Sequence, residues 1–191
     1  MLEKIKNDLP NFPDEVIKSW LEPYANSEGW PPSNSDRWAG ILFGRDLTFW
    51  NKVSWSKKSI DLSNITLSDI TQRSLRGMYS GYVNRENNLY NKMIPDGPNR
   101  FYKSLAYIME HGIFPNPPCL LLKNGNYSVV DGNHRVLAWQ KYYEITKNFK
   151  GADEIKEVNS FKEAVRKKYN INKLVPLLEL QEVWLAKMSE D

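Results

Sequence analysis

The stretch Tyr127–Trp139 reads YSVVDGNHRVLAW, and it predicts a buried strand that turns sharply into a helix. Gly132 permits a backbone conformation that a side chain disfavours, and Asn133 is a residue type that caps a following helix. The first N–H groups of that helix have no intrahelical acceptors, and the helix dipole makes this end positive. We therefore expect an anion-binding turn here, and phosphate is the usual occupant of such a turn.

The turn carries three side chains suited to phosphate chemistry. Arg135 offers a planar fork for two phosphate oxygens, and His134 is a donor or proton carrier near neutral pH. Asp131 ends the strand, where it can act as a base, orient His134 or help to hold a metal ion carried by phosphates. A structural interpretation stays open, because Asp and Gly are ordinary turn residues, the histidine can be a satisfied buried residue and the arginine can form a salt bridge.

The patterns on either side of the turn predict an α+β fold. Residues Arg100–His111 form an amphipathic helix that Gly112 ends. A hairpin joins Cys119–Leu122 to Tyr127–Val130 through an Asn-Gly turn. Residues Tyr79–Asn99 are polar and predict a long surface loop that can include a helical turn, a type of segment that is often functional. The other predicted helices are Asn11–Asn26, Leu67–Met78, Val136–Tyr143 and Ser160–Tyr169, with a short helix or turn at Arg37–Leu42. The other predicted strands are Leu47–Trp55, Ser59–Ile65 and Leu174–Leu180, followed by a helical or extended tail at Glu182–Met188.

The composition excludes several classes of protein. The chain has 191 residues, of which 41% are hydrophobic, so it can bury a core. A net charge of +3 is too small to indicate nucleic acid by itself. With one cysteine and two histidines a metal site would have to rest mainly on carboxylates, and we assign none. No apolar run approaches about 18 residues and the charged N-terminus is not a signal peptide, so we expect a cytoplasmic protein without a membrane contact.

Tryptophan is concentrated in the first third of the chain. Aromatic side chains mostly serve cores and interfaces, so we interpret these residues as a packed layer. A stacking platform for a base or a peptide is the alternative. We therefore predict a Trp-rich, mainly helical extension over residues 1–52 that packs on a core formed by residues 53–191. The tryptophans are Trp20, Trp30, Trp38, Trp50 and Trp55.

The run Leu105–Trp139 resembles the core of the ParB/sulfiredoxin superfamily. The shared order is a helix ending in Glu-His-Gly-Ile (Glu110–Ile113), a proline-marked entry, an apolar strand, a turn, a second strand, and Asp-Gly-Asn-His-Arg opening a helix. The resemblance implies a small mixed sheet flanked by helices, with a nucleotide bound at the last turn. The residues that it implies around the phosphates are Gly132, Asn133, His134 and Arg135.

Activities in this superfamily are diverse, and the sequence departs from two of its branches. Sulfiredoxins, which repair sulfinic acids with ATP, carry a cysteine where this chain has Asn133. The chain's own Cys119 stands at a strand start, where we expect a small core residue. Residues 144–191 leave little room for the helix-turn-helix and dimerisation domain of a full partition protein. CTP hydrolysis, ADP-dependent serine phosphorylation and nuclease activity are the other activities that the resemblance implies.

A loop before the helix that leads into the motif also contributes phosphate contacts in the superfamily. Its counterpart here is Ile94–Arg100, which makes Arg100 the second anion-binding candidate. An ordinary exposed arginine stays an open interpretation. Asp96 and Glu86 are weaker candidates for a base or a metal ligand, because the loop has no spacing signature.

Three functions agree with these features. We favour a nucleotide-dependent enzyme, either an NTP- or ADP-dependent phosphotransferase or an NTP hydrolase. Asp131 and His134 would be catalytic, and Arg135 and Arg100 would hold the phosphates of ATP, ADP or CTP, with Mg²⁺ as the metal. The partner would be a nucleotide or a phosphorylated small molecule.

The two alternatives draw on the N-terminal third. A DNA-acting ParB-like nuclease would use the tryptophans with Lys52, Lys57 and Lys58 as a strand-binding surface, although the weak net charge disfavours nucleic acid. A non-catalytic protein-interaction module would keep the fold and use the Trp-rich segment for protein contacts.

Overall fold

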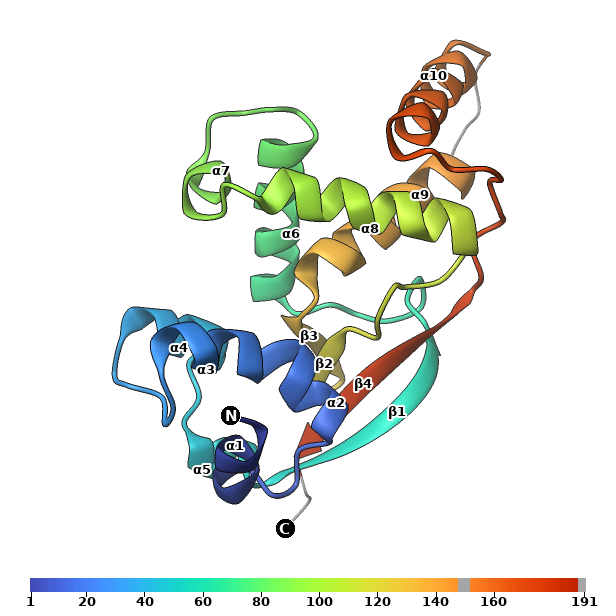
Figure 1. Ribbon diagram of the computed structural model, residues 1–191. Coiled ribbons are helices and arrows are strands. Elements are labelled where there is room, and N and C mark those ends of the chain that lie inside the picture. Colours follow the sequence, from blue (N-terminus) through green and yellow to red (C-terminus); the bar gives the residue numbers. More distant parts are fainter. Residues whose placement is uncertain (148–151, 189–191) are drawn as a thin grey trace.

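A computed structural model describes residues 1–147 and 152–188 of the chain (Figure 1). In this part of the protein, helices lie on both faces of one mixed sheet, which makes the fold α+β. The helices are α1 (Leu2–Asp8), α2 (Asp14–Val16), the π-helical segment η1 (Ile17–Leu21), α3 (Glu22–Glu28), α4 (Asp36–Ile41), α5 (Leu47–Trp50), α6 (Asp69–Tyr82), α7 (Leu89–Met93), α8 (Gly97–His111), α9 (Asn133–Lys147) and α10 (Ala152–Tyr169), and the strands are β1 (Val53–Asp61), β2 (Cys119–Lys123), β3 (Asn126–Asp131) and β4 (Leu180–Met188).

The sheet has the strand order β1–β4–β2–β3. Strand β4 pairs antiparallel with β1 and parallel with β2, and β2 pairs antiparallel with β3. The hairpin between β2 and β3 turns at Asn124 and Gly125, whose φ angles of 50° and 74° suit a tight hairpin turn. The last strand of the chain therefore lies between the first strand and the hairpin that carries the candidate turn.

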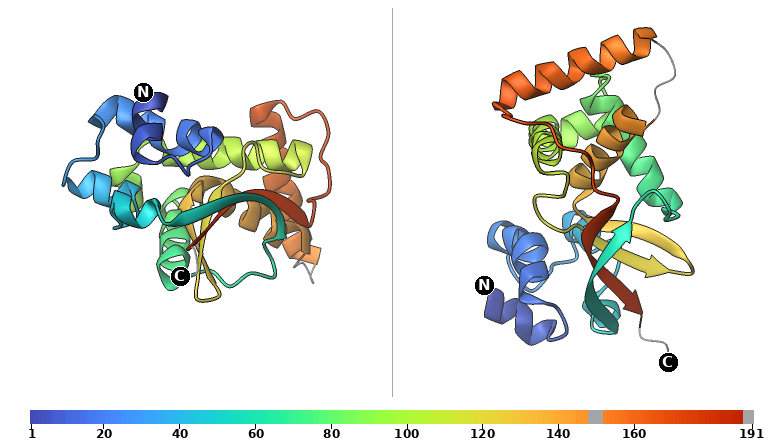
Figure 2. Two further views of the ribbon diagram at one scale, coloured as in Figure 1. Left: turned by 90° about the horizontal axis from the view of Figure 1, so that it is seen from below. Right: turned by 90° about the vertical axis from the view of Figure 1, so that its right-hand side faces the viewer.

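Strand β2 is buried on both sides of the sheet, and its successive residues point to opposite sides. Leu120 of β2 packs into a core with residues of α6, α8 and α9. Its neighbours Cys119 and Leu121 pack into a second core with the N-terminal helices. Figures 1 and 2 show α6, α8 and α9 gathered on one side and the N-terminal helices on another. The hairpin is therefore held from both sides.

The N-terminal layer is built around packed aromatic rings. Trp20 and Trp50 cross with ring centroids 5.1 Å apart, and Phe12 meets Trp55 at 4.9 Å. The indole N–H of Trp50 donates to the Leu42 carbonyl at 3.1 Å. The interpretation as a packed layer is confirmed for the buried tryptophans, and these rings are not available as a stacking platform. They are Trp20, Trp38 and Trp50.

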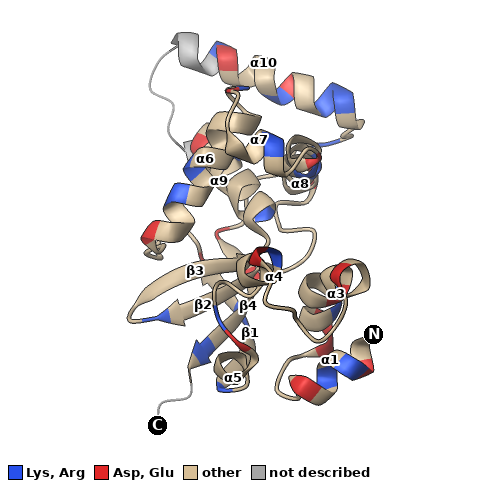
Figure 3. Ribbon diagram, turned by 90° about the vertical axis from the view of Figure 1, so that its left-hand side faces the viewer, with Lys and Arg blue, Asp and Glu red and all other residues tan. Residues whose placement is uncertain are grey.

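The lysines proposed for strand binding are Lys52, Lys57 and Lys58, and Figure 3 colours the charged residues on one side of the protein. There Lys and Arg are interspersed with Asp and Glu along the elements. One of these lysines, Lys57 on β1, forms an ion pair with Glu182 on β4 at 3.3 Å. Opposite charges placed across neighbouring strands support the pairing of β1 with β4.

The predicted strand at Leu174–Leu180 is wrong, and the tail predicted at Glu182–Met188 is the central strand β4. Pro176 gives the reason, since proline has no N–H to donate and does not fit a central strand. Gln181 fixes the strand's true start, because its fully buried amide donates to the carbonyls of Gly112 at 3.0 Å and Leu178 at 2.8 Å. Gly112 ends α8 in a left-handed conformation, as predicted.

The strand predicted at Leu47–Trp55 is wrong over its first half, which forms α5. The Asp46 carboxylate accepts a hydrogen bond from the Phe49 N–H at 2.7 Å and so caps this helix. The predicted strand Ser59–Ile65 extends too far, since the observed strand β1 stops at Asp61. Side-chain capping and the burial of Trp50 thus override the strand pattern.

The predicted loop Tyr79–Asn99 is largely helical, comprising the end of α6, all of α7 and the start of α8. Asn88 caps α7 by accepting from the Tyr90 N–H, and its Nδ2 donates to the Gly77 carbonyl at 2.8 Å. Asn91 likewise donates to a carbonyl of α6. The asparagines that suggested a loop instead fasten α7 to α6.

The helix predicted at Asn11–Asn26 begins at Asp14 and continues through η1 and α3 to Glu28. Pro23 does not end it, because this proline stands in the first turn of α3, directly after the π-helical segment. The other predicted helices all overlap helices of the structure. Within the described residues, we find no helix whose length and apolar character would let it cross a bilayer.

Trp50→Ala tests the packed N-terminal layer. The side chain is fully buried, so we expect the free energy of unfolding to fall by about 3–5 kcal/mol, measured by urea unfolding followed by circular dichroism. Leu89 on α7 is 64% exposed, and Leu89→Ala should change stability by less than about 0.5 kcal/mol. Two equally small effects would contradict the packing described for Trp50.

Candidate functional site

The turn Asp131–Arg135 forms the start of α9. Gly132 has a φ of 91°, a backbone conformation that glycine tolerates best. Its carbonyl oxygen accepts hydrogen bonds from the N–H groups of Arg135 at 2.9 Å and Val136 at 3.0 Å. Asn133 was predicted to cap α9, and this prediction is wrong by one residue. Gly132 occupies the cap position, and Asn133 is the first helical residue.

The N–H groups of Asn133 and His134 are the first two of α9, a helix of 15 residues. The first N–H groups of a helix have no intrahelical acceptor and carry the positive end of its dipole. Neither group donates to a backbone carbonyl outside the helix in the described part of the chain. These two amides are therefore the donors that the turn offers to an anion.

Arg135 is directed into the turn and not toward solvent. Its Nη2 contacts Oδ2 of Asp131 at 2.5 Å, and the two side chains are 14% and 18% exposed. Its Nη1 donates to the carbonyl oxygens of Asn116 at 3.1 Å and Pro117 at 3.5 Å. The guanidinium lies so close to Gly132 that a Cβ there would stand 2.7 Å from Nη2. Arg135 thus ties the helix start to the segment before β2, and it does not present the free phosphate fork expected from the sequence.

The carboxylate of Asp131 is engaged by the same contact. Burial raises the pKa of Asp131, while Arg135 and the N–H of Gly132 favour the carboxylate and oppose this rise. Removing one member of a buried ion pair leaves the other charge uncompensated. The Asp131 carboxylate therefore has a partner within the turn, and its role as a base stays a prediction.

His134 packs its ring flat against Tyr82, with ring centroids 5.6 Å apart and planes 8° apart. Nε2 of His134 and the hydroxyl of Tyr82 are both buried and have no hydrogen-bond partner among the described residues. Buried polar atoms nearly always have a partner, whether protein, water or ligand. This pair therefore leaves two polar groups beside the helix start that the described residues do not satisfy.

The protonation states of this pair follow from its surroundings. Burial, then the charges of Arg100 and Arg135, lower the pKa of His134 to about 4. Its ring is therefore neutral near pH 7, with one nitrogen that donates and one that accepts. Burial raises the pKa of Tyr82 to about 12, so its hydroxyl keeps its proton. The site combines neutral donors with nearby cations, an arrangement that suits an anion.

Arg100 in the first turns of α8 lies close to the same place. Its charge acts on the pKa of His134, Tyr82 and Asp131. Its Nε contacts Oδ2 of Asp96 at 3.3 Å, and both side chains are more than half exposed. The two sequence-predicted arginines thus act on the same groups at the start of α9, with Arg135 mostly buried and Arg100 open to solvent.

Of two further residues that the sequence singled out, Glu86 lies away from the turn, whereas Cys119 pairs across strands with Asp131. The carboxylate of Glu86 accepts hydrogen bonds from the Ser80 hydroxyl and from the amide of Asn84 at 3.5 Å, so it belongs to the connection between α6 and α7. Cys119 is fully buried, as predicted for a core residue, and burial raises the pKa of its thiol.

Two tyrosines at the site have no signal in the sequence. Tyr82 ends α6, inside the stretch predicted as a loop, and packs against Gly97, where any Cβ would collide with its ring. Tyr24 belongs to α3, and burial and then the charge of Asp131 raise its pKa. The N-terminal layer therefore reaches the candidate turn, and only the folded chain brings these residues together.

In residues 1–147 and 152–188, no three His, Cys, Asp or Glu side chains form a group able to hold a metal ion. A cavity of about 560 Å³ lies further along α9, away from the turn. The turn stays the candidate phosphate site, because phosphates bind to exposed helix starts and need no deep cavity.

Comparisons with known proteins found no matching family model, no matching curated protein and no matching solved structure. The likeness of Leu105–Trp139 to the ParB/sulfiredoxin core accordingly stays a likeness of motif and element order. The function proposed below rests on the residues and geometry of the turn.

Arg135→Met tests the role of the buried pair. It leaves the Asp131 carboxylate without its partner, so we expect a loss of about 3–5 kcal/mol in the free energy of unfolding at neutral pH, measured by urea unfolding. Arg100→Met removes an arginine of an exposed ion pair and should lower stability by less than about 1 kcal/mol. Equal effects of the two substitutions would show that Arg135 does not hold the turn.

The lowered pKa of His134 predicts that the stability of the protein depends on pH. The pKa of its imidazole is about 4 in the folded protein against an ordinary 6.5, so between these pH values the unfolded chain binds more protons. The contribution of His134 is therefore complete above about pH 6.5 and is lost as the pH falls toward 4. His134→Gln should flatten this fall by up to about 3 kcal/mol, measured by urea unfolding at a series of pH values. His111→Gln keeps His134 and should retain the wild-type slope; if it flattens the curve equally, the assignment to His134 is wrong.

Proposed function

We propose that this protein binds a nucleotide at the start of α9, with a phosphate group against the N–H groups of Asn133 and His134. The observation that carries the proposal is that two buried polar atoms without partners among the described residues, His134 Nε2 and the Tyr82 hydroxyl, lie beside the residues of these amides. A phosphate offers several acceptor oxygens and can satisfy such a group of donors together.

Arg100 would supply the charge on the open side of the site. Its Nε is engaged by Asp96, and within the described chain no residue accepts a hydrogen bond from its two terminal nitrogens. A guanidinium whose two terminal nitrogens have no protein acceptor can bind two phosphate oxygens at once. Arg135 and Asp131 would act as positioning residues that keep the amides of the turn in place.

We further propose that the nucleotide is a substrate, which makes the protein an NTP- or ADP-dependent phosphotransferase or an NTP hydrolase. Phosphoryl transfer depends mainly on positioning and on stabilising charge. A bound phosphate would raise the pKa of the neutral His134, which could then donate a proton from Nε2. Mg²⁺ would arrive with ATP, ADP or CTP, since this ion is usually held by substrate phosphates and one or two carboxylates.

The resemblance of Leu105–Trp139 to the ParB/sulfiredoxin core supports this proposal, because it implies a nucleotide at the same turn. The order α8, β2, β3, α9 agrees with the element order on which the resemblance was based. We propose that residues 53–191 form a domain of this type and that the protein works in the cytoplasm, where nucleotides are abundant.

Calorimetric titration with ATP, ADP and CTP, each with and without Mg²⁺, tests the proposal. We expect at least one of them to bind, and Arg100→Ala to weaken that binding by about tenfold or more, since hydrogen bonds to charged groups are strong. Lys103 lies on the same helix and is exposed, so Lys103→Ala is the matched control and should bind as the wild type does. No binding by any nucleotide, or equal binding by the two variants, would overturn the proposal.

A further inference from the structure

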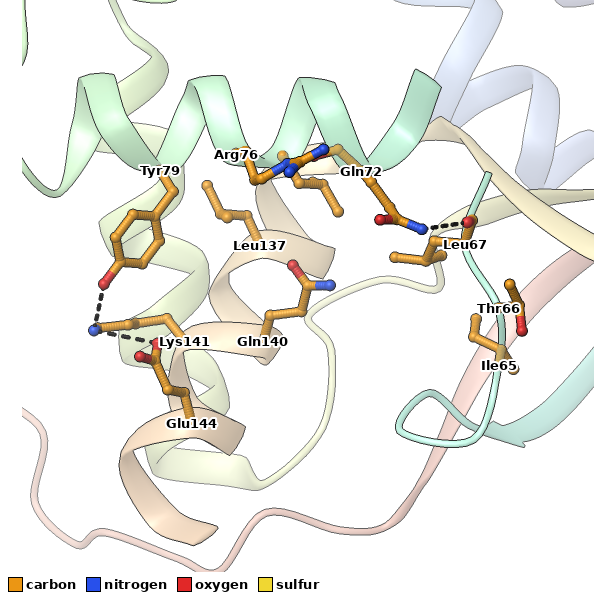
Figure 4. A pocket seen from close by; sticks show the side chains of 11 residues that line it. Ile65, Thr66, Leu67, Gln72, Arg76, Tyr79, Leu137, Gln140, Lys141 and Glu144 are labelled. Carbon is orange, nitrogen blue, oxygen red and sulfur yellow. Dashed lines mark hydrogen bonds and ion pairs between the residues drawn. The ribbon is translucent and has the colours of Figure 1, made fainter. Parts of the chain in front are cut away.

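A separate cavity of about 560 Å³ opens between α6 and α9, beside residues 65–67 (Figure 4). Its volume lies within the usual range of small-molecule sites. Leu75 and Leu137 line it from the two helices, and Ile65 and Leu67 line its edge. These side chains provide an apolar surface for the body of a ligand.

Some polar groups of the cavity are already engaged by the protein. Nζ of Lys141 donates to the Tyr79 hydroxyl at 2.8 Å and contacts Oε2 of Glu144 at 3.4 Å. Nε2 of Gln72 donates to the Leu67 carbonyl at 2.8 Å. These contacts fix the two ends of the cavity, and they leave little of Lys141 for a ligand.

Apart from the Thr66 hydroxyl, the cavity lining has two larger polar groups with few or no protein contacts. The side-chain amide of Gln140 has no hydrogen-bond partner among the described residues, and Figure 4 shows it extending from α9 into the space between α6 and Leu67. Arg76 on α6 uses only its Nε, in a long contact of 3.4 Å with the Gln72 carbonyl. No carboxylate in the described chain pairs with this arginine. The cavity therefore presents one free amide and one free guanidinium above apolar side chains.

We infer that this cavity binds a small planar heteroaromatic molecule that carries an acidic group. The Gln140 amide offers a donor and an acceptor side by side, which a ring edge with adjacent acceptor and donor matches in two hydrogen bonds. Arg76 matches a carboxylate or a similar planar acid. An aliphatic acid would desolvate the Gln140 amide without replacing its hydrogen bonds, and that penalty disfavours it. The inference does not depend on the nucleotide proposed for the turn.

Pterin-6-carboxylate is a suitable probe, because it combines a flat ring system, an amide-like edge and a carboxylate, carries no phosphate and is fluorescent. We expect saturable binding with a Kd below about 1 mM, followed by fluorescence. Pterin without the carboxylate and naphthalene-2-carboxylate without the polar edge should each bind about tenfold more weakly. A probe without phosphate also separates this result from any result at the turn.

Variants locate the binding. Gln140→Leu should weaken pterin-6-carboxylate about tenfold and leave naphthalene-2-carboxylate unchanged or tighter, because it removes the amide and keeps a side chain of similar size. Arg76→Ala should weaken both carboxylates about tenfold. Arg73 lies on the same helix outside the cavity lining, and Arg73→Ala should stay within about twofold of the wild type.

The opposite results would overturn the inference. These are the absence of saturable binding, equal binding of all three probes, or unchanged binding of pterin-6-carboxylate by both Gln140→Leu and Arg76→Ala. Circular dichroism of each variant establishes that it is folded before it is compared.

Discussion

The ion pair between Asp131 and Arg135 is the contact on which the candidate site depends. It closes the turn between β3 and α9, and the same guanidinium reaches the carbonyls of Asn116 and Pro117 ahead of β2. Gly132 makes this approach possible, since a Cβ there would collide with the guanidinium. Donors that are fixed before a ligand arrives need no reorganisation to bind it. The buried pair therefore serves the site by holding the first amides of α9 in one place.

The N-terminal layer completes this arrangement from the other face of the sheet. Cys119 and Leu121 of the hairpin are buried under it, so the layer stabilises the strands that lead into the turn. Tyr24 from the same layer is close enough for the charge of Asp131 to raise its pKa. The Trp-rich segment thus contributes to the surroundings of the site as well as to packing.

Local patterns predicted the parts of the fold that local interactions decide. The hairpin, the helix before it and the position of the turn depend on residues near one another in the sequence, and these predictions agree with the structure. The ion pair of Arg135 with Asp131 joins residues four apart and was an open interpretation of the sequence, whereas the contact of Arg135 with the Asn116 carbonyl is set by the folded chain. The same holds for the stacking of Tyr82 on His134. Strand β4 was missed because the apolar run before it attracted the strand prediction, although Pro176 in that run argues against a central strand.

The central claim is that the start of α9 binds phosphate. NMR amide resonances of an isotope-labelled sample test this claim most directly. On titration with ADP, the account predicts saturating shifts of the N–H resonances of Asn133 and His134, and of the side chain of Arg100, larger than those elsewhere in the protein. If ADP binds while these resonances stay in place and the largest shifts fall on other elements, the site is not at this turn and the account is contradicted.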